Sequence, residues 1–176
     1  HALAWRLAQA PGLQKIYLAP GNAGTAHRIE MENLPITDPV ALADFAAKEK
    51  IHLTVVGPEA PLAAGIVNIF RERGLKIFGP TKEAAQLESS KDFAKQFMKR
   101  HNIPTAKYET FDGTTVEEGL KFLETLKAPY VLKADGLCAG KGVLILPTLE
   151  EAKKEFREML GGMFGNASAR VVIEEF

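Results

Sequence analysis

Residues 131–146 read VLKADGLCAGKGVLIL, with three glycines and two lysines between two apolar runs. The flanking runs YVLKA (130–134) and GVLIL (142–146) are apolar and short, which predicts a strand, a loop over residues 135–142 and a second strand. Glycines allow backbone N–H groups to turn inward and form a concavity that binds anions. The stretch therefore predicts a hairpin with a candidate anion-binding loop.

The loop differs from a P-loop, whose pattern GxxxxGK is followed by Ser or Thr and then by a helix. Gly136 and Gly140 are one residue too close, Gly142 replaces the hydroxyl residue, and the next segment is a strand. A strand cannot place a helix N-terminus on a phosphate. With eight residues, the loop is longer than the two to five of a tight hairpin. We interpret it as a candidate lid that closes on a ligand, with a solvated surface hairpin as the alternative.

Lys133 lies inside the first of these strands. By strand alternation it shares a face with Val131, so its ammonium group points inward or into a cleft. Burying a lysine without an anionic partner is costly, and a phosphate oxygen would satisfy it. Cys138 is interpreted as a small side chain rather than a nucleophile, because no histidine lies near it in the sequence.

Helices and strands alternate through residues 1–80. The sequence predicts a helix over residues 1–10, a strand at KIYLAP (15–20), a helix from Asp38 and Pro39, a buried strand at IHLTVV (51–56), a helix from Pro61 to Gly74 and a strand at LKIFG (75–79). This order is typical of a parallel sheet with helices on its faces, an α/β fold of the Rossmann-like kind. Ligands in such folds lie beyond the carboxyl ends of the strands.

The pattern changes from about Thr81, and we place a domain boundary near residues 80–90, giving domains 1–85 and 86–176. Two helices are predicted over residues 81–102, then a strand at TAKYETF (105–111) and the hairpin. Capping boxes are predicted at Thr114 with Glu117 and at Thr148 with Glu151. A flexible loop, GGMFGNASA (161–169), precedes a last strand, RVVIEEF (170–176). The second domain is therefore predicted to be α+β.

Composition excludes several classes. Lys plus Arg equals Asp plus Glu at 22 each, which gives no argument for a nucleic-acid or membrane partner. A single cysteine excludes an internal disulfide and fits a reducing cytoplasm. No apolar run approaches the roughly 20 residues of a membrane span. The first helix has no start residue and the last strand is interrupted, so we expect a piece of a longer protein, lacking the first strand of its first domain and truncated in its second.

The motif KADGLCAGKGV (133–143) closely resembles the phosphate lid of ATP-grasp ligases, in particular the phosphoribosylamine–glycine ligase family. HALAW, APGNAGTA, VVGPEAPL, GLKIFGPT, AAQLESSK, HNIPTA and VVIEEF agree in order, so that the resemblance covers essentially the whole chain. Where the family usually has alanine, this chain has Cys138. The resemblance implies a Rossmann-like pre-ATP-grasp domain followed by part of an ATP-grasp domain.

The resemblance also implies a reaction. ATP, glycine and 5-phosphoribosylamine would give glycinamide ribonucleotide, ADP and phosphate through a glycyl phosphate, the second step of de novo purine biosynthesis. Such chemistry requires positioning, charge neutralisation and exclusion of water rather than a protein nucleophile. The cofactors implied are ATP and Mg²⁺ (or Mn²⁺). The metal ligands would lie beyond residue 176, so no metal ligand is assigned within this chain. We expect a cytoplasmic monomer or weak homodimer.

The resemblance assigns residue roles. Lys133 and Lys141 would be the catalytic cations, and the ATP-binding residues would be Lys91, Lys133, Asp135, Gly136, Gly140, Lys141, Gly142, Glu174 and Glu175, the last two on the adenine side. The 5-phosphoribosylamine site would comprise Gly21, Asn22, Gly24, Thr25, Glu59 and Pro61. Each residue has an ordinary alternative: Lys91 as a solvated lysine, the two glutamates as charges on an edge strand, and the first-domain segments as plain turns.

Two alternatives to the ligase stay open. One is another ATP-grasp ligase of purine metabolism, such as a ribonucleotide carboxylase, which the combination of GPEAPL with DGLCAGKG disfavours. The other is a non-catalytic nucleotide-binding module.

Overall fold

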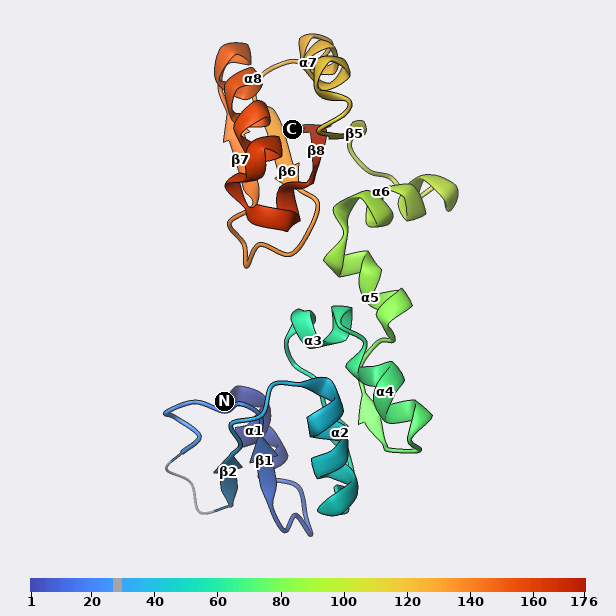
Figure 1. Cartoon of the computed structure of the whole chain (residues 1–176), viewed down its shortest axis with the longest axis vertical. Coiled ribbons are helices and arrows are strands. Elements are labelled where there is room, and N and C mark those ends of the chain that lie inside the picture. The colour runs from blue at the N-terminus through green and yellow to red at the C-terminus, as the bar shows by residue number, and fades with distance from the viewer. Residues whose placement is uncertain (27–29) are drawn as a thin grey trace. The chain divides into compact units, whose positions relative to one another are not determined.

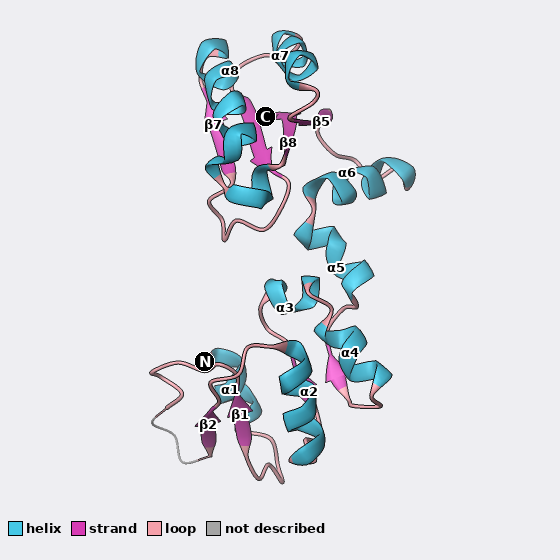
Figure 2. Cartoon of the chain, in the orientation of Figure 1, coloured by secondary structure: helices cyan, strands magenta, loops and turns pink. Residues whose placement is uncertain are grey.

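The computed structural model describes residues 1–26 and 30–176 (Figures 1 and 2). The chain divides into two compact units, unit 1 (His1–Glu83) and unit 2 (Ala84–Phe176). Helix α5 (Lys82–Ser89) contains the division between the two units as well as the boundary predicted after residue 85. Among the described residues, no helix is long and apolar enough to cross a membrane.

Unit 1 alternates helices and short strands, as predicted. Its elements are α1 (Ala2–Leu7), β1 (Ile16–Leu18), β2 (Met31–Asn33), α2 (Pro39–Lys48), β3 (Thr54–Val55), α3 (Glu59–Ala63), α4 (Ile66–Glu72) and β4 (Ile77–Phe78). All pairing is parallel, β1 with β2 and β3 with β4, so the described strands form two separate pairs. The α/β class is thus confirmed, although β2 was not expected from the sequence.

The core of unit 1 forms where α2 packs on α4. Ala43 and Ala46 of α2 meet Val67 and Phe70 of α4, all buried. Helix α2 begins where the sequence predicts, because the Asp38 side chain accepts a hydrogen bond from the Ala41 backbone N–H at 2.7 Å and Pro39 occupies the first turn.

Two predicted elements of unit 1 are corrected. The helix expected from Pro61 to Gly74 is two helices, because Gly65 adopts a left-handed conformation with φ of 90° and interrupts it. The first of them begins at Glu59, so that Pro61 lies inside α3 rather than at its start. The predicted buried strand 51–56 is reduced to the two half-buried residues of β3, and Leu53 beside it is 48% exposed.

Unit 2 contains one four-stranded antiparallel sheet in the order β5-β8-β6-β7. After α5 its elements are α6 (Lys91–Arg100), β5 (Tyr108–Asp112), α7 (Val116–Glu124), β6 (Tyr130–Ala134), β7 (Val143–Leu146), α8 (Leu149–Glu158), the π-helix η1 (Met159–Met163), the 3-10 helix η2 (Gly165–Ser168) and β8 (Arg170–Glu175). The predicted strand–loop–strand unit is therefore present as β6, the glycine loop and β7.

One face of this sheet packs against α7 and α8 (Figure 1). Leu132 of β6 and Ile173 of β8 meet Leu123 of α7 and Phe156 of α8, and all four are fully buried. By strand alternation, Lys133 and Glu174 belong to the opposite face. The hydrophobic core thus holds β6 and β8 in place, and the opposite face of these strands carries Lys133 and Glu174.

Two further predictions for unit 2 are wrong. Thr114 does not cap α7: Thr115 is the N-cap residue without a side-chain cap, and the Thr114 hydroxyl donates to Asp112 Oδ1 at 2.6 Å. Residues 161–169 are mostly helical in η1 and η2 rather than a flexible loop. The alternative that read Glu174 and Glu175 as charges on an edge strand is excluded, because β8 lies between β5 and β6. The cap at Thr148 is confirmed, since its hydroxyl accepts from the Glu151 N–H at 3.3 Å.

Candidate functional site

The face of the sheet of unit 2 that lies opposite α7 and α8, called the open face below, can be read from the strand register. One row across it comprises Tyr108, Glu174, Val131 and Ile145, and the next comprises Thr110, Val172, Lys133 and Val143. Lys133 and Glu174 are therefore diagonal neighbours on adjacent strands, a separation that long side chains bridge. On this face Val131 and Val172 of the inner strands are buried, whereas Val143 and Ile145 of the edge strand are exposed.

Two lysines share the carboxylate of Glu174. Lys133 Nζ forms an ion pair with Glu174 Oε1, and Lys95 Nζ of α6 forms one with Oε2. Lys95 is nearly fully buried; it also donates to the Thr105 hydroxyl at 2.8 Å and lies 5.3 Å from the centre of the Tyr108 ring. The Lys133 side chain keeps 28% of its surface exposed, so it can still reach a ligand.

The ion pairs decide the ionisation of Glu174. Burial raises the pKa of this carboxyl, but hydrogen bonds and charge from Lys133 and Lys95 outweigh burial and hold the pKa below its ordinary value. The group therefore carries a negative charge at neutral pH. Two ammonium groups and one carboxylate leave the cluster with one net positive charge, which would attract an anion.

Lys91 is held at the base of the glycine loop. Its Nζ donates to the carbonyl oxygen of Gly136 at 3.1 Å, and its backbone N–H donates to the carbonyl oxygen of Asp135 at 3.1 Å. Ser90 caps the same helix end by accepting from the Phe93 N–H. A cation at a helix N-terminus is unfavourable on its own, and here the two loop carbonyls compensate it.

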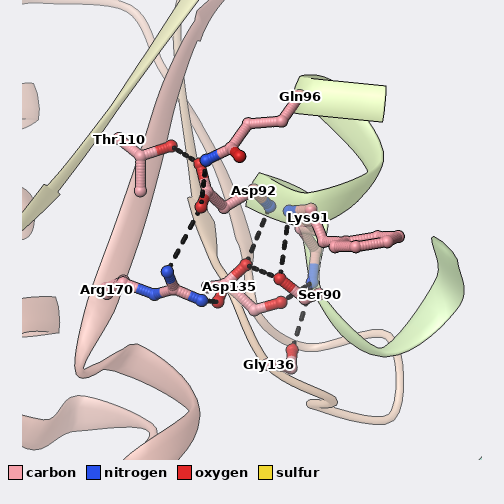
Figure 3. A network of polar contacts seen from close by, with 9 residues as sticks. Ser90, Lys91, Asp92, Gln96, Thr110, Asp135, Gly136 and Arg170 are labelled. Atoms are coloured by element: carbon pink, nitrogen blue, oxygen red, sulfur yellow. Dashed lines mark hydrogen bonds and ion pairs between the residues drawn. The ribbon is translucent and has the colours of Figure 1, made fainter. Parts of the chain in front are cut away.

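Asp135 and Arg170 connect α6 to the sheet (Figure 3). Asp135 Oδ1 accepts from the Ser90 hydroxyl at 2.9 Å and from the Asp92 N–H at 2.8 Å, while its Oδ2 accepts from Arg170 at 2.6 Å. Arg170 also donates to Asp92 at 3.2 Å, and Asp92 accepts from Thr110. The structure therefore corrects the lid assignment of Asp135: it is buried at the base of the loop, with both carboxylate oxygens occupied.

The tip of the loop is a tight turn. The Lys141 N–H donates to the carbonyl oxygen of Cys138 at 2.9 Å, and both intervening residues have positive φ, 48° for Ala139 and 79° for Gly140. Such φ values are those of a type I′ hairpin turn. Lys141 is exposed at this tip, but Gly142 is buried against Cys138, so the predicted eight-residue lid contains a compact two-residue turn.

Gly136 also lies at the base of the loop rather than at its tip. Its N–H donates to the carbonyl oxygen of Ala167 at 2.9 Å, and an added Cβ would lie 2.9 Å from the Ala167 Cα. Glu175 differs from its neighbour Glu174 because its side chain points to solvent, while its N–H donates to the carbonyl oxygen of Lys107. Of the two predicted glutamates, only Glu174 is joined to the lysines.

The predicted substrate residues of unit 1 include a self-contained turn. Thr25 is fully buried; its hydroxyl accepts from the Asn22 N–H at 3.0 Å and donates to Asn33 Oδ1 at 2.8 Å. Its N–H is also used, donating to the carbonyl oxygen of Asn22. Both donors of Thr25 are therefore bound within unit 1, where they shape the loop. The place of Thr25 in the 5-phosphoribosylamine site stays a prediction.

Gly21 and Gly24 are required by the packing of this turn. A Cβ on Gly21 would lie 2.2 Å from Asn33 Oδ1, and one on Gly24 would lie 2.4 Å from His1 Nδ1. The Gly24 N–H donates to Asn22 Oδ1 at 2.9 Å. Glu59 is exposed at the start of α3, and Pro61 is half-buried within it. Contact of these residues with substrate stays a prediction.

Sequence reasoning missed Lys95, Asp92, Arg170 and Asn33. Lys95 stands four residues after Lys91 in KDFAK, and this spacing puts both lysines on one face of a helix. That signal was available in the sequence. The pairing of Arg170 with Asp92 and Asp135 joins residues 35 or more positions apart, which no local pattern indicates.

Residues 89–176 match the ATP-grasp (A) domain of phosphoribosylglycinamide synthetase, so unit 2, with its lysine-bearing sheet, is of the ATP-grasp class. Residues 1–88 match the N domain of the same synthetase. The chain therefore belongs to the phosphoribosylglycinamide synthetase family.

The chain is 60% identical over 177 residues to a phosphoribosylamine–glycine ligase of Ralstonia nicotianae, and the match covers all of this chain and 42% of that protein. The crystal structure of a phosphoribosylamine–glycine ligase from Thermotoga maritima is similar with a TM-score of 0.77 and 34% identity, again over all of this chain and 41% of the other. The chain thus spans about two fifths of the length of the curated relatives it matches.

The fold extends to distant enzymes. The biotin carboxylase domain of a 2-oxoglutarate carboxylase from Hydrogenobacter thermophilus, solved with MgADP, is similar with a TM-score of 0.71 at 18% identity, covering 92% of this chain and 39% of that one. At this identity the likeness concerns the fold alone.

Proposed function

We propose that this chain is the nucleotide-binding part of an ATP-dependent carbon–nitrogen ligase that joins glycine to 5-phosphoribosylamine and yields glycinamide ribonucleotide, ADP and phosphate. This reaction is the second step of de novo purine biosynthesis. The observation that carries the proposal is the positively charged cluster of Lys133, Glu174 and Lys95 on the open face of an ATP-grasp sheet. The identity to named ligases supports the choice of substrates.

ATP would lie on the open face of unit 2, with its phosphates at the cations. Lys133 would reach the phosphates from the sheet, Lys91 from the base of the loop, and the exposed Lys141 from the tip beside Gly140. Gly136 and the buried Gly142 shape the loop by allowing close packing. The adenine would lie towards Glu174 and Glu175, next to the exposed apolar Ile145.

The chemistry consists of two displacements. A glycine carboxylate oxygen attacks the γ-phosphorus of ATP, the bond from phosphorus to ADP breaks, and glycyl phosphate forms. The amine of phosphoribosylamine then attacks the acyl carbon, phosphate leaves and the nitrogen loses a proton. Lys133 and Lys141 would neutralise the phosphate charge in both steps, while the loop would exclude water from the acyl phosphate.

A divalent cation, Mg²⁺ or Mn²⁺, would accompany ATP and neutralise part of its phosphate charge. Within residues 1–26 and 30–176, no group of three or more His, Cys, Asp or Glu side chains could hold a metal ion. The lysines of this chain are suited to the phosphate oxygens themselves. We therefore assign the phosphates to this chain and no metal ligand to it.

Unit 1 would bind 5-phosphoribosylamine. The turn formed by Gly21, Asn22 and Gly24 would receive the phosphate, and Glu59 in the α3 segment with Pro61 would accept from ribose hydroxyls. Both segments follow the carboxyl ends of parallel strands, because β1 leads into the turn and β3 leads into α3. Ligands of α/β sheets bind at these ends, which supports the assignment. We further propose that the protein acts in the cytoplasm as a monomer or weak homodimer, without nucleic-acid or membrane partners.

The test uses the protein expressed from its complete natural coding sequence. ADP release is measured with glycine and phosphoribosylamine present together and with each omitted. Turnover that requires both substrates is expected. ATP hydrolysis that ignores both would contradict the ligase and favour another ATP-grasp enzyme, whereas nucleotide binding without turnover would favour a non-catalytic module.

Replacing Lys133 by Ala is expected to abolish measurable ATP binding, because it removes the cation that faces the phosphates and leaves Glu174 with Lys95 alone. Calorimetric titration with ATP measures the effect. Lys127→Ala, at an exposed lysine before β6, is the matched control and should bind like the unaltered protein. Unchanged affinity in Lys133→Ala would remove this residue from the proposed site.

A further inference from the structure

Lys95 belongs to the charged cluster but is assigned no ligand in the proposed reaction, and it is the more deeply buried of the two lysines bound to Glu174. Its side chain is 10% exposed, compared with 28% for Lys133. It is fixed by the Thr105 hydroxyl at 2.8 Å and by the carbonyl oxygen of Ala106 at 3.5 Å. A lysine held this firmly in the interior does not itself reach a ligand on the open face, so its effect must pass through its neighbours.

Each carboxylate oxygen of Glu174 is paired with a different lysine. Lys95 occupies Oε2 and Lys133 occupies Oε1 of one carboxylate. With Lys95 present, the three groups carry one net positive charge, and Lys133 is the member that faces outward. Without Lys95, Glu174 and Lys133 would form a neutral one-to-one pair. A neutral pair attracts a polyanion much less than a cluster with one positive charge.

We propose that Lys95 is a positioning residue for anion binding: by holding one oxygen of Glu174, it keeps Lys133 oriented and only partly neutralised, so that Lys133 can bind the phosphates of a nucleotide. This inference rests on the proposed function for the identity of the anion. It goes further by assigning a role to a buried lysine that touches no ligand. In this arrangement Glu174 links buried Lys95 to Lys133, which is partly exposed on the open face.

The experiment compares ATP, AMP and adenosine as ligands of the protein expressed from its complete natural coding sequence. Lys95→Met removes the charge and keeps much of the side-chain volume. We expect ATP affinity to fall on the order of tenfold, as the loss of one charge from a partly buried cluster implies, AMP affinity to fall less, and adenosine affinity to stay within about twofold. Lys99→Met, at an exposed lysine one turn further along α6, is the control and should alter none of these affinities substantially, because exposed charges are screened by salt.

A second variant separates charge from packing. Lys95→Met/Glu174→Gln leaves Lys133 as the only charge of the three, so the net charge returns to that of the unaltered protein. We expect the ratio of ATP to adenosine affinity to recover in this double variant, and Lys95→Arg to retain it. Thermal melts show that each variant is folded at the assay temperature, and the ratio cancels any loss common to both ligands.

Three results would overturn the role of Lys95: equal losses for ATP and adenosine, an unchanged ATP affinity in Lys95→Met, or no recovery in the double variant. The ligase assay on the unaltered protein reports on the proposed function separately. An unaltered protein that binds ATP but does not consume glycine would contradict the ligase, while the affinity ratios would still decide the role of Lys95.

Discussion

At the scale of single residues, the ionisation of Glu174 links the stability of unit 2 to its candidate site. The folded state holds the pKa of this carboxyl below its ordinary value of 4.5. A carboxyl whose pKa is lowered by folding stabilises the folded state at pH values above its ordinary pKa. This stabilisation is lost as pH falls through the lower pKa of the folded state. Lys95 and Lys133, which give the site its positive charge, therefore also make the stability of unit 2 depend on pH in the acidic range.

Glu174→Gln is expected to lower the free energy of unfolding at pH 7 by about 3 kcal/mol, because it leaves Lys95 buried without its carboxylate while Lys133 can hydrate. Urea unfolding from pH 7 down to pH 3 measures it. The difference between variant and unaltered protein should shrink as pH falls below 4.5, and it should be smallest below the lowered pKa of folded Glu174, where both carry a neutral group at this position. Glu124→Gln, at an exposed carboxylate paired with Lys153, is the control and should change stability little.

At the scale of elements, the sequence predicted those held by local signals. The Asp38 and Thr148 caps and the apolar runs around the glycine loop each act within a few residues, and the structure has α2, α8, β6 and β7 in these places. Alternation also put Lys133 on the same face as Val131, pointing inward or into a cleft, with a phosphate oxygen as its expected partner. In the structure this face lies opposite the α7–α8 core, and the partner of Lys133 is the carboxylate of Glu174.

The errors arose where tertiary packing determines the position of a strand or the partner of a side chain. Strand β8 was open to interpretation as an edge strand because its two terminal glutamates suggest solvent, yet it lies inside the sheet and one of them is buried between lysines. The lid assignment of Asp135 failed for a similar reason: its partners are Ser90, which caps α6, Asp92 of α6 and Arg170 of β8. A linear pattern holds no information on which distant chain segment supplies a partner.

Gly119 provides an element-scale prediction, because it allows α7 to approach α8. An added Cβ would lie 2.3 Å from Phe156 Cζ and 3.1 Å from Phe111 Cγ. Gly119→Ala is expected to destabilise the protein by about 2 kcal/mol through overpacking, although alanine favours helices by about 1 kcal/mol over glycine. Denaturant unfolding measures the change. Gly113→Ala, in a turn where an added Cβ meets nothing within 4 Å, is the matched control.

Combining Gly119→Ala with Phe156→Leu should recover part of the loss, because the smaller side chain relieves the overlap. The free energy of unfolding of the double variant should be higher, by about 1 kcal/mol, than the value obtained by adding the losses of the two single variants. Strictly additive losses would show that Phe156 is not the group that limits the approach of the two helices.

At the scale of the whole molecule, each unit has its own core, and this predicts separate responses to core mutations. Phe70 is buried in the α2–α4 core of unit 1, and Phe156 of α8 is buried in the core of unit 2 among residues of α7 and the sheet. Replacing either by Ala removes a fully buried ring, at a cost of about 3–5 kcal/mol. Amide exchange followed by mass spectrometry should show that Phe70→Ala lowers protection within residues 1–83, whereas Phe156→Ala lowers it within residues 84–176. Helix α5 contains the division and should respond to both changes. If either variant instead lowered protection equally throughout, the two units would unfold as one cooperative body, and the charged cluster of unit 2 would depend on the packing of unit 1.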